Sequence, residues 1–271
     1  MEILLTGQRG RLGTVIARRL EIAGHQIRGF DIADGFDILD PASVRRAARA
    51  VETIIHVAGL ADDRQGAPTD VMKVNLLGTA NVLFAAEAEN VRRVIYFSSG
   101  KSLGMLERDP DYLPVDDAHR GLPSAPYGLA KWLSEEMCAA FTHRTGIDTI
   151  CLRPVAVFDD EGYRRMPTAP PAATARGRAW HLATHIHVED VAEATEAALR
   201  TGFRGHTRLL LCASDVADHR PTLDLVRTHV PDVPWRGGPE YGRDSYRSLI
   251  DISRARDVLG WEPRHRWPGR A

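Results

Sequence analysis

The stretch EILLTGQRGRLGTVIARRLEIAG (residues 2–24) decides the fold. It starts as a short apolar strand, turns through Gly7, Gly10 and Gly13, and continues as an amphipathic helix that ends at Gly24. In such a turn the first glycine permits the bend, the second lets the backbone approach a pyrophosphate, and the third lets helix pack on strand. The unpaired N–H groups of the first helical turn can then bind phosphate. The sequence therefore predicts a dinucleotide-binding unit.

An acid closes the next predicted strand, residues 25–31. Asp31 lies about 20 residues beyond the glycine turn, where a carboxylate accepts hydrogen bonds from the adenosine ribose. A negative charge there repels the extra phosphate of NADP, so NAD is the expected cofactor and NADP is disfavoured. Arg9 argues the other way, because its guanidinium could meet a 2′-phosphate. The alternative role for Asp31 is to cap the end of a strand.

Strands and helices alternate through the first 158 residues. We expect strands at residues 51–59, 91–100 and 148–158, with helices from Pro41, over residues 68–90, and through Tyr127. This alternation predicts an α/β fold of the Rossmann type, a doubly wound parallel sheet with right-handed crossovers. Residues 1–158 are the predicted dinucleotide-binding core. Residues 159–271 are predicted to form mostly a small C-terminal substrate-binding lobe, with segments around 181–212 returning to the core sheet, so that all form one structural unit.

Composition narrows the possible partners. The 271 residues are 44% apolar and carry a net charge of −1, so neither nucleic acid nor a membrane surface is an expected partner. No apolar run reaches the ~18 residues of a membrane span, and no signal peptide is apparent, which favours a cytoplasmic protein. Cysteines and histidines are the residue types that could indicate a metal site. We predict buried or packing roles and no metal site for Cys138, Cys151, Cys212, His185 and His187.

The run SAPYGLAKWLSEEM (residues 124–137) carries the predicted chemistry. Tyr127 and Lys131 are four apart and lie on one face of a helix, so an ammonium is held near a phenol. We expect that cation to lower the phenol pKa and make Tyr127 an acid or base for an alcohol that loses or gains hydride. Ser99 ends a predicted strand, where it could hold the substrate oxygen. The alternatives are a solvated lysine beside a half-buried tyrosine, and a serine that only makes a turn.

Taken together, these residues resemble an extended short-chain dehydrogenase/reductase of the NAD-dependent epimerase/dehydratase group. The resemblance runs in the family's order over nearly the whole chain. It rests on TGQRGRLG, Asp31, FDILD, HVAG, VNLLGTANVL, YFSS, PYGLAK, LRPVAVF, HVEDVAEA and DISRARDVLGWEP.

The resemblance implies a role for each matching position. Ser99, Tyr127 and Lys131 would be the catalytic triad, and Tyr127 and Lys131 would also contact the cofactor. The other implied cofactor-binding residues are Gly7, Gly10 and Gly13 in the turn, Arg11 and Leu12 over the pyrophosphate, Asp31 at the ribose, Asp37 and Ile38 at the adenine, Val57, Ala58 and Gly59 on the adenosine half, Asn75 as a support, and Pro154 and Val155 at the nicotinamide.

Departures from the family pattern bear on the substrate. Gly100 and Lys101 stand where dehydratases of the group carry an Asp-Glu pair, so sugar 4,6-dehydration is not expected. The segments that hold a nucleotide diphosphate in many members are not evident, and SSGKSLG with a reduced C-terminal lobe resembles uronate dehydrogenases. Lys101 could bind a substrate carboxylate or phosphate, or could be a solvated loop lysine. We expect substrate contacts within residues 60–70, 100–108 and 155–185.

Three functions remain open. The first is an NAD-dependent oxidoreductase or epimerase acting on a secondary alcohol of a sugar or nucleotide sugar. The second is oxidation of a free sugar acid, as in uronate dehydrogenases. The third is a non-catalytic dinucleotide-binding sensor. A homodimer through the helices containing Asn75 and Lys131 is also expected, with an apolar face from Met72, Leu76, Leu83, Trp132 and Met137.

Overall fold

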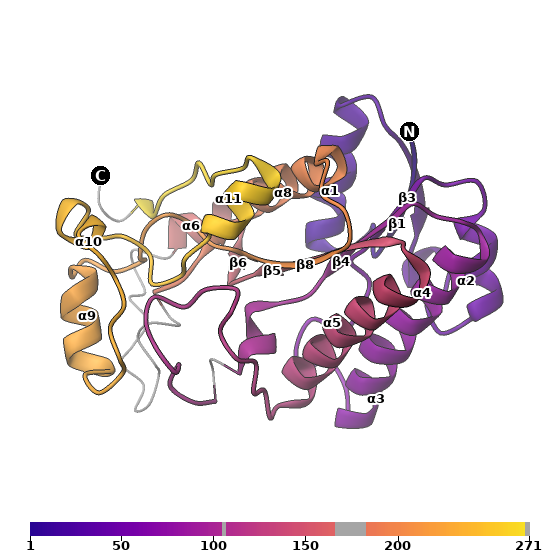
Figure 1. The fold of residues 1–271 in the computed structure, drawn as a ribbon. Coiled ribbons are helices and arrows are strands. Elements are labelled where there is room, and N and C mark those ends of the chain that lie inside the picture. Colours follow the sequence, from indigo (N-terminus) through magenta and orange to yellow (C-terminus); the bar gives the residue numbers. More distant parts are fainter. Residues whose placement is uncertain (105–106, 166–182, 269–271) are drawn as a thin grey trace.

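A computed structural model describes residues 1–104, 107–165 and 183–268. Its main sheet has six strands in the order β2-β1-β3-β4-β5-β8, and every neighbouring pair is parallel (Figure 1). The strands are β1 Glu2–Thr6, β2 Gln26–Phe30, β3 Thr53–His56, β4 Arg93–Phe97, β5 Asp148–Pro154 and β8 His206–Leu211. The chain moves outward from β1 to β2 and then crosses to β3, so the strand order reverses between β1 and β3. This confirms the predicted doubly wound α/β fold.

Helices cover both faces of the sheet (Figure 1). One face carries α1 Arg11–Ile22, α8 Val188–Arg200 and α11 Ser253–Leu259; the other carries α2 Pro41–Ala48, α3 Pro68–Met72, α4 Gly78–Ala88 and α5 Pro126–Thr145. Along β1, Ile3 and Leu5 belong to the core beneath α1 and α8, whereas Leu4 belongs to the core beneath α2 and α4. Successive side chains point to opposite faces, and this explains why a strand buried on both sides is apolar throughout.

The long helix predicted over residues 68–90 is interrupted. Between α3 and α4, residues Lys73–Leu77 form a π-helical turn that contains Asn75. Such a turn inserts one extra residue and rotates the side chains that follow it, and it is common at functional sites. Helix α1 also differs from the prediction, because it begins at Arg11, directly after the turn glycine Gly10, rather than at residue 14.

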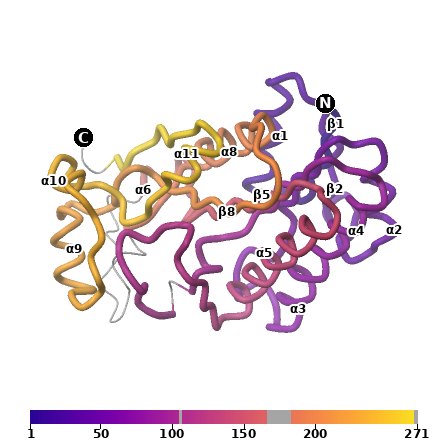
Figure 2. Tube along the Cα trace, in the orientation of Figure 1, coloured from indigo at the N-terminus to yellow at the C-terminus, as the bar shows by residue number. Residues whose placement is uncertain are grey.

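The C-terminal part lies at the far end of the molecule from the N-terminal strands (Figure 2). It contains α9 Thr222–His229 and α10 Glu240–Arg243, and bridges from Leu113 to Trp235 and from Val115 to Ile250 connect it to the loop before α5. Within residues 181–212, β8 joins the main sheet. Strand β7 Ile186–His187 instead pairs with β6 Val157–Phe158 in a separate two-stranded sheet. Of the range 155–185 in which we expect substrate contacts, residues 166–182 lie outside the described residues.

The histidines and cysteines singled out in the sequence make ordinary interior contacts. His185 accepts or donates a hydrogen bond at 2.8 Å with the hydroxyl of Tyr163, which lies on α6 Asp160–Arg165, and its other ring nitrogen lies 3.2 Å from Asp215. His187 lies 3.2 Å from Asp160. All three cysteines are free and buried. Among the described residues, no helix combines the length and apolar character needed to cross a membrane.

Candidate active site

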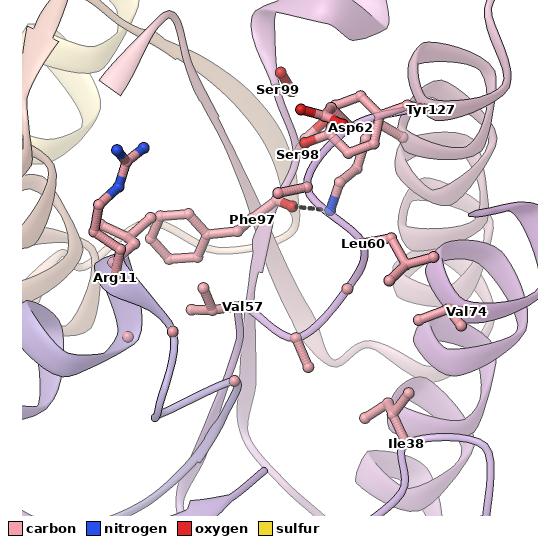
Figure 3. Close-up of a pocket in the computed structure, with 18 of the residues that line it drawn as sticks. Arg11, Ile38, Val57, Leu60, Asp62, Val74, Phe97, Ser98, Ser99 and Tyr127 are labelled. Atoms are coloured by element: carbon pink, nitrogen blue, oxygen red, sulfur yellow. Dashed lines mark hydrogen bonds between the residues drawn. The ribbon is translucent and has the colours of Figure 1, made fainter. Parts of the chain in front are cut away.

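A cavity of about 960 Å³ opens at the carboxyl ends of β1, β3, β4 and β5. This is the edge at which open parallel sheets bind their ligands, and the cavity includes the point where the strand order reverses. Of the residues predicted for the cofactor, the triad and the substrate, every one except Asn75 lines this cavity. Figure 3 shows Ser99, Asp62 and Tyr127 gathered at one end, Ile38 and Val74 at the other, and Arg11 across from them.

The glycine turn gives the cavity its floor. A Cβ placed on Gly13 would lie 2.0 Å from the Gly7 carbonyl oxygen, so only glycine lets α1 approach the turn this closely. Gly10 precedes the first turn of α1, and no side chain caps that end of the helix. The N–H groups of the first turn therefore stay available to an anion, and a dinucleotide pyrophosphate fits this arrangement.

Asp31 lies in the cavity wall and holds the loop after β2. Its carboxylate accepts hydrogen bonds from the backbone N–H of Arg9 at 2.8 Å and of Ala33 at 3.0 Å. It thus caps the turn Ile32–Asp34 while remaining one of the residues that line the cavity. The two interpretations offered for Asp31, a ribose ligand and a cap, are compatible with each other in this geometry.

Arg9 does not point freely toward a ribose. Its guanidinium makes a two-pronged ion pair with Asp34, with the closest N–O distances at 2.9 Å. Because of this contact, the pKa of the Asp34 carboxyl is held below its ordinary value. Where the resemblance implies adenine contacts, Ile38 is 6% exposed, and Asp37 accepts a hydrogen bond from the backbone of Leu39 at 2.8 Å.

The three proposed catalytic residues come from one helix and one turn. Ser99 begins the short turn Gly100–Leu103 after β4, and its hydroxyl accepts a hydrogen bond from the backbone N–H of Lys101 at 3.2 Å. Tyr127 and Lys131 lie one turn apart near the start of α5, and both are buried. The Lys131 ammonium donates to the Phe97 carbonyl oxygen at 2.7 Å and lies 5.7 Å from the centre of the Tyr127 ring. Strand β4 and helix α5 are therefore joined directly at the site.

The expected lowering of the phenol pKa by Lys131 is not found. Burial raises the pKa of Tyr127 to about 12, and the nearby Ser99 hydroxyl offsets this only in part. Burial also lowers the pKa of Lys131 to about 8. The physical reason is that the ammonium is directed at a backbone carbonyl on β4, while the phenol lies in a site that penalises the phenolate. The pair alone does not make Tyr127 a base.

Acidic residues that sequence reasoning did not single out border the triad. Asp62 lines the cavity beside Tyr127, and Asp63 accepts a hydrogen bond at 2.7 Å from the backbone N–H of Tyr127. Asp63 thereby caps α5 from another part of the chain, since the residue before that helix, Ala125, has no side chain that can do so. Both acids follow β3 directly, within the range 60–70 expected to meet substrate, but nothing in their type or spacing distinguishes them from solvated loop residues.

Lys101 reaches the same end of the cavity. Its ammonium lies 5.3 Å from the centre of the Tyr127 ring. Among the described residues, this ammonium makes neither a hydrogen bond nor an ion pair. It lies near enough to Asp62 to help lower that carboxyl's pKa, although Arg64 has the larger effect. A cation beside the phenol can therefore receive an anionic group.

Asn75 acts from behind the cavity. It is 1% exposed, and its side-chain amide donates to the Leu60 carbonyl oxygen at 3.0 Å. A Cβ on Gly59 would lie 2.3 Å from the amide oxygen of Asn75, so the two segments are in close contact. The π-helical turn brings Asn75 to this position, from which it supports the loop after β3.

The fold and the cavity define a Rossmann-type α/β protein with its site at the strand-order reversal. The model of the NAD-dependent epimerase/dehydratase family matches residues 3–210, and the chain belongs to this family. It is therefore an enzyme of the extended short-chain dehydrogenase/reductase type.

Curated relatives include two kinds of enzyme. Uronate dehydrogenase of Pseudomonas syringae pv. tomato is 28% identical over 218 residues, covering 76% of this chain and 72% of the relative. UDP-glucose 4-epimerase of Rhizobium meliloti is 25% identical over 308 aligned positions, covering 97% of this chain and 92% of the relative. A short-chain dehydrogenase/reductase superfamily protein from Agrobacterium tumefaciens, solved with bound NAD, has a TM-score of 0.75 at 23% identity and covers 99% of this chain and 94% of that one.

Proposed function

We propose that this enzyme transfers hydride between NAD and a secondary alcohol of a sugar-like substrate, using Ser99, Tyr127 and Lys131. The observation that supports this most is their convergence at one end of a single cavity, whose other end is formed by the glycine turn and Asp31. A non-catalytic dinucleotide sensor would need neither the phenol nor the ammonium at that place.

The residues present fit NAD. The first turn of α1 and Arg11 would bind the pyrophosphate, and Asp31 the adenosine ribose. Bound NAD supplies the acceptor for the hydride. Ser99 holds the substrate oxygen and Tyr127 exchanges a proton with it. Burial raises the phenol pKa to about 12 even with Lys131 and Lys101 beside the ring, so oxidation would need the further positive charge of an oxidised nicotinamide near Tyr127. In the reverse direction the protonated phenol is already suited to donate.

Lys101 favours a substrate with a carboxylate, and we propose a free sugar acid. In the ring form of a uronic acid, the carbon that bears the carboxylate and the anomeric carbon flank the same ring oxygen. A cation near the catalytic phenol can thus hold the carboxylate while the anomeric hydroxyl faces Tyr127. The similarity to uronate dehydrogenase supports this choice.

A second candidate is epimerisation of a nucleotide sugar. It is supported by the length over which UDP-glucose 4-epimerases align with this chain. An epimerase returns the hydride to the opposite face of the ketone, so no NADH accumulates. A dehydrogenase releases it.

NAD rather than NADP is the proposed cofactor. Asp31 places a negative charge in the cavity wall, and the one arginine of the glycine turn that we expected to favour a 2′-phosphate, Arg9, is engaged by Asp34. The three free cysteines further suit a reducing compartment such as the cytoplasm, which we propose as its location.

We also propose a homodimer through the helices that contain Asn75 and Lys131, with one change to the expected apolar face. Leu83 is 2% exposed and belongs to the core, so it cannot contribute. Leu77 ends the π-helical turn and Phe84 lies two turns further on, in α4; they are 47% and 61% exposed. Phe84→Glu is expected to convert a dimer into a monomer in light-scattering chromatography; an unchanged mass would exclude this face.

The test of function is NADH formation, followed by its near-ultraviolet absorbance, with NAD and a panel of uronic acids, neutral sugars and nucleotide sugars. A rise with uronic acids that Tyr127→Phe lacks supports the sugar-acid oxidation. Interconverted sugars without net NADH support the epimerase. Biological function that survives Tyr127→Phe would contradict both and favour the sensor.

A further inference from the structure

A buried ion pair lies beneath the candidate active site. Glu135 on α5 is fully buried, and Arg153 on β5 is 2% exposed. The guanidinium donates to both carboxylate oxygens, from Nε at 2.9 Å and from Nη2 at 2.5 Å. The Ser98 hydroxyl, at the end of β4, donates to the same carboxylate in a short hydrogen bond. One side chain thus connects three separate segments.

Each member of this cluster is next to a residue of the site. Ser98 directly precedes Ser99, and Arg153 directly precedes Pro154. Glu135 follows Lys131 by one helical turn on the same face of α5. The cluster therefore fixes β4, α5 and β5 relative to one another at the level where they present the serine, the lysine and the wall at the nicotinamide end.

Such a pair is better suited to fixing geometry than to adding stability. Removing two charges from water is costly, and a buried ion pair is often no more stabilising than apolar residues of the same size. A two-pronged arginine–carboxylate contact, in contrast, sets both the distance and the angle between its partners. The catalytic rate is sensitive to such displacements.

We propose that Glu135 is the positioning residue of this active site: together with Ser98 and Arg153, it sets the place of Lys131 relative to the strand end that carries Ser99. This inference rests on the proposed function only for the catalytic roles of Ser99 and Lys131. The placement itself can be measured without a substrate.

The surroundings of Lys131 make its ammonium a reporter. Burial lowers its pKa to about 8, and the negative charge of Glu135 opposes this. The titratable groups that face it from β3, β4, β5 and α5 are His56, Tyr96, Cys151, Tyr127, Glu135 and Cys138. Loss of the Glu135 charge leaves Arg153 with only the Asp117 carboxyl, 3.8 Å away, as a neighbouring acid, so both effects lower the Lys131 pKa further.

A matched control lies at the opposite end of the same two strands. Arg93 and Asp148 form a buried ion pair at the amino ends of β4 and β5, with side chains each 3% exposed. Asp148→Asn therefore removes one charge from a buried arginine–carboxylate pair, as Glu135→Gln does, but far along the strands from Lys131.

The chain suits a direct measurement, because it contains only three lysines: Lys73, Lys101 and Lys131. With carbon-13-labelled lysine, their side-chain signals can be assigned by lysine-to-arginine variants and titrated by NMR in the full-length protein. We expect Glu135→Gln to lower the Lys131 midpoint by roughly half a pH unit or more, and Asp148→Asn to leave it unchanged.

If Glu135→Gln does not fold, Glu135→Asp decides the matter. It keeps the charge but shortens the side chain by one methylene. We expect the Lys131 midpoint to fall again, by less than in Glu135→Gln. An unchanged Lys131 midpoint in the folded Glu135 variants, or an equal shift in Asp148→Asn, would overturn the inference. Failure of the proposed function would appear separately, as a Tyr127→Phe variant that keeps full activity.

Discussion

Two buried arginine–carboxylate pairs lie at opposite ends of β4 and β5, and they do different things. At the amino ends, Arg93 pairs with Asp148 and also donates to the carbonyl oxygens of Ala198 at 2.9 Å and Phe203 at 2.6 Å. Its N–H groups thus bind backbone carbonyl oxygens at the end of α8 and in the loop that follows. This pair closes the fold and is remote from the cavity.

At the carboxyl ends, Arg153 makes fewer hydrogen bonds than Arg93, although each of the two arginines has one buried nitrogen without a partner among the described residues. The Nη1 of Arg153 makes no hydrogen bond and lies 3.8 Å from Asp117, whose own Oδ2 is also without a hydrogen-bond partner among the described residues. On our proposal, an arginine–carboxylate pair is structural at one sheet edge and positions a site at the other. Open parallel sheets bind ligands at the carboxyl ends of their strands, so only the pair at that end lies near the site.

Removal of the Tyr127 hydroxyl is expected to have the largest effect. It tests whether the catalytic residues lie at the carboxyl ends of the strands. Tyr127→Phe should lower kcat by about 10²- to 10⁴-fold, because it removes the proton-transferring group. The dissociation constant for NAD, measured by quenching of protein fluorescence, should stay near the wild-type value. An active Tyr127→Phe enzyme would place the chemistry elsewhere.

The two ion pairs can be compared directly by activity and stability. Glu135→Gln should lower kcat by roughly 10- to 100-fold per folded molecule, since displaced catalytic groups react slowly. Asp148→Asn should destabilise the fold by about 3–5 kcal/mol, because it leaves a buried charge unpaired, but should keep kcat close to wild type. Denaturant unfolding and steady-state kinetics measure both. The comparison fails if the two variants lose kcat equally.

The pH dependence of the free energy of unfolding tests Asp117, the carboxyl beside the Arg153 pair. Burial raises the pKa of this carboxyl to about 7, above its ordinary value of 3.8. Its contribution to the free energy of unfolding is therefore fully present below about pH 4 and is lost as pH rises through about 7. We expect wild type to lose roughly 1–4 kcal/mol more than Asp117→Asn over that interval. Parallel stability curves for the two proteins would show that Asp117 does not titrate in this way.

A substitution of Lys101 tests substrate binding at the carboxyl ends of the strands. Lys101→Ala should raise KM for a uronic acid by about tenfold, the loss of one charge-assisted contact of modest strength, with little change in kcat. Lys73→Ala, which removes an exposed lysine outside the cavity, is the matched control. Equal KM values for both variants would mean that Lys101 is a solvated loop residue.

The smallest effect concerns the cofactor. Asp34→Asn releases the Arg9 guanidinium and removes one negative charge near Asp31, so affinity for NADP should rise by roughly two- to fivefold while NAD binding is unchanged. The change should disappear when Arg9→Ala is added. Titration of each nucleotide by calorimetry would settle it, and no gain in NADP affinity would show that Asp34 does not restrain Arg9.

Much of the fold could be predicted because the signals are local. The glycine turn, the apolar strands and the alternation with helices predict the doubly wound sheet, and the resemblance to the family implies most of the residues that line the cavity. The π-helical turn around Asn75 could not be predicted, because the sequence there has an ordinary helical pattern and the extra residue is stabilised by tertiary contacts.

The electrostatics of the site were the least predictable. The spacing of Tyr127 and Lys131 is correct for one helix face, but the phenol pKa depends on burial and on the carbonyl oxygen that accepts the ammonium's hydrogen bond. Glu135 and Arg153 are 18 positions apart in sequence and look like surface charges there. Only the pairing of β4 with β5 beneath α5 brings them together.

The most direct measurement is NADH formation from NAD and uronic acids by wild type, Tyr127→Phe and Asp148→Asn, each corrected for the folded fraction. NADH should form with wild type and with Asp148→Asn, and Tyr127→Phe should form essentially none. NADH formed by Tyr127→Phe at the wild-type rate would contradict the assignment of chemistry to the carboxyl edge of the sheet.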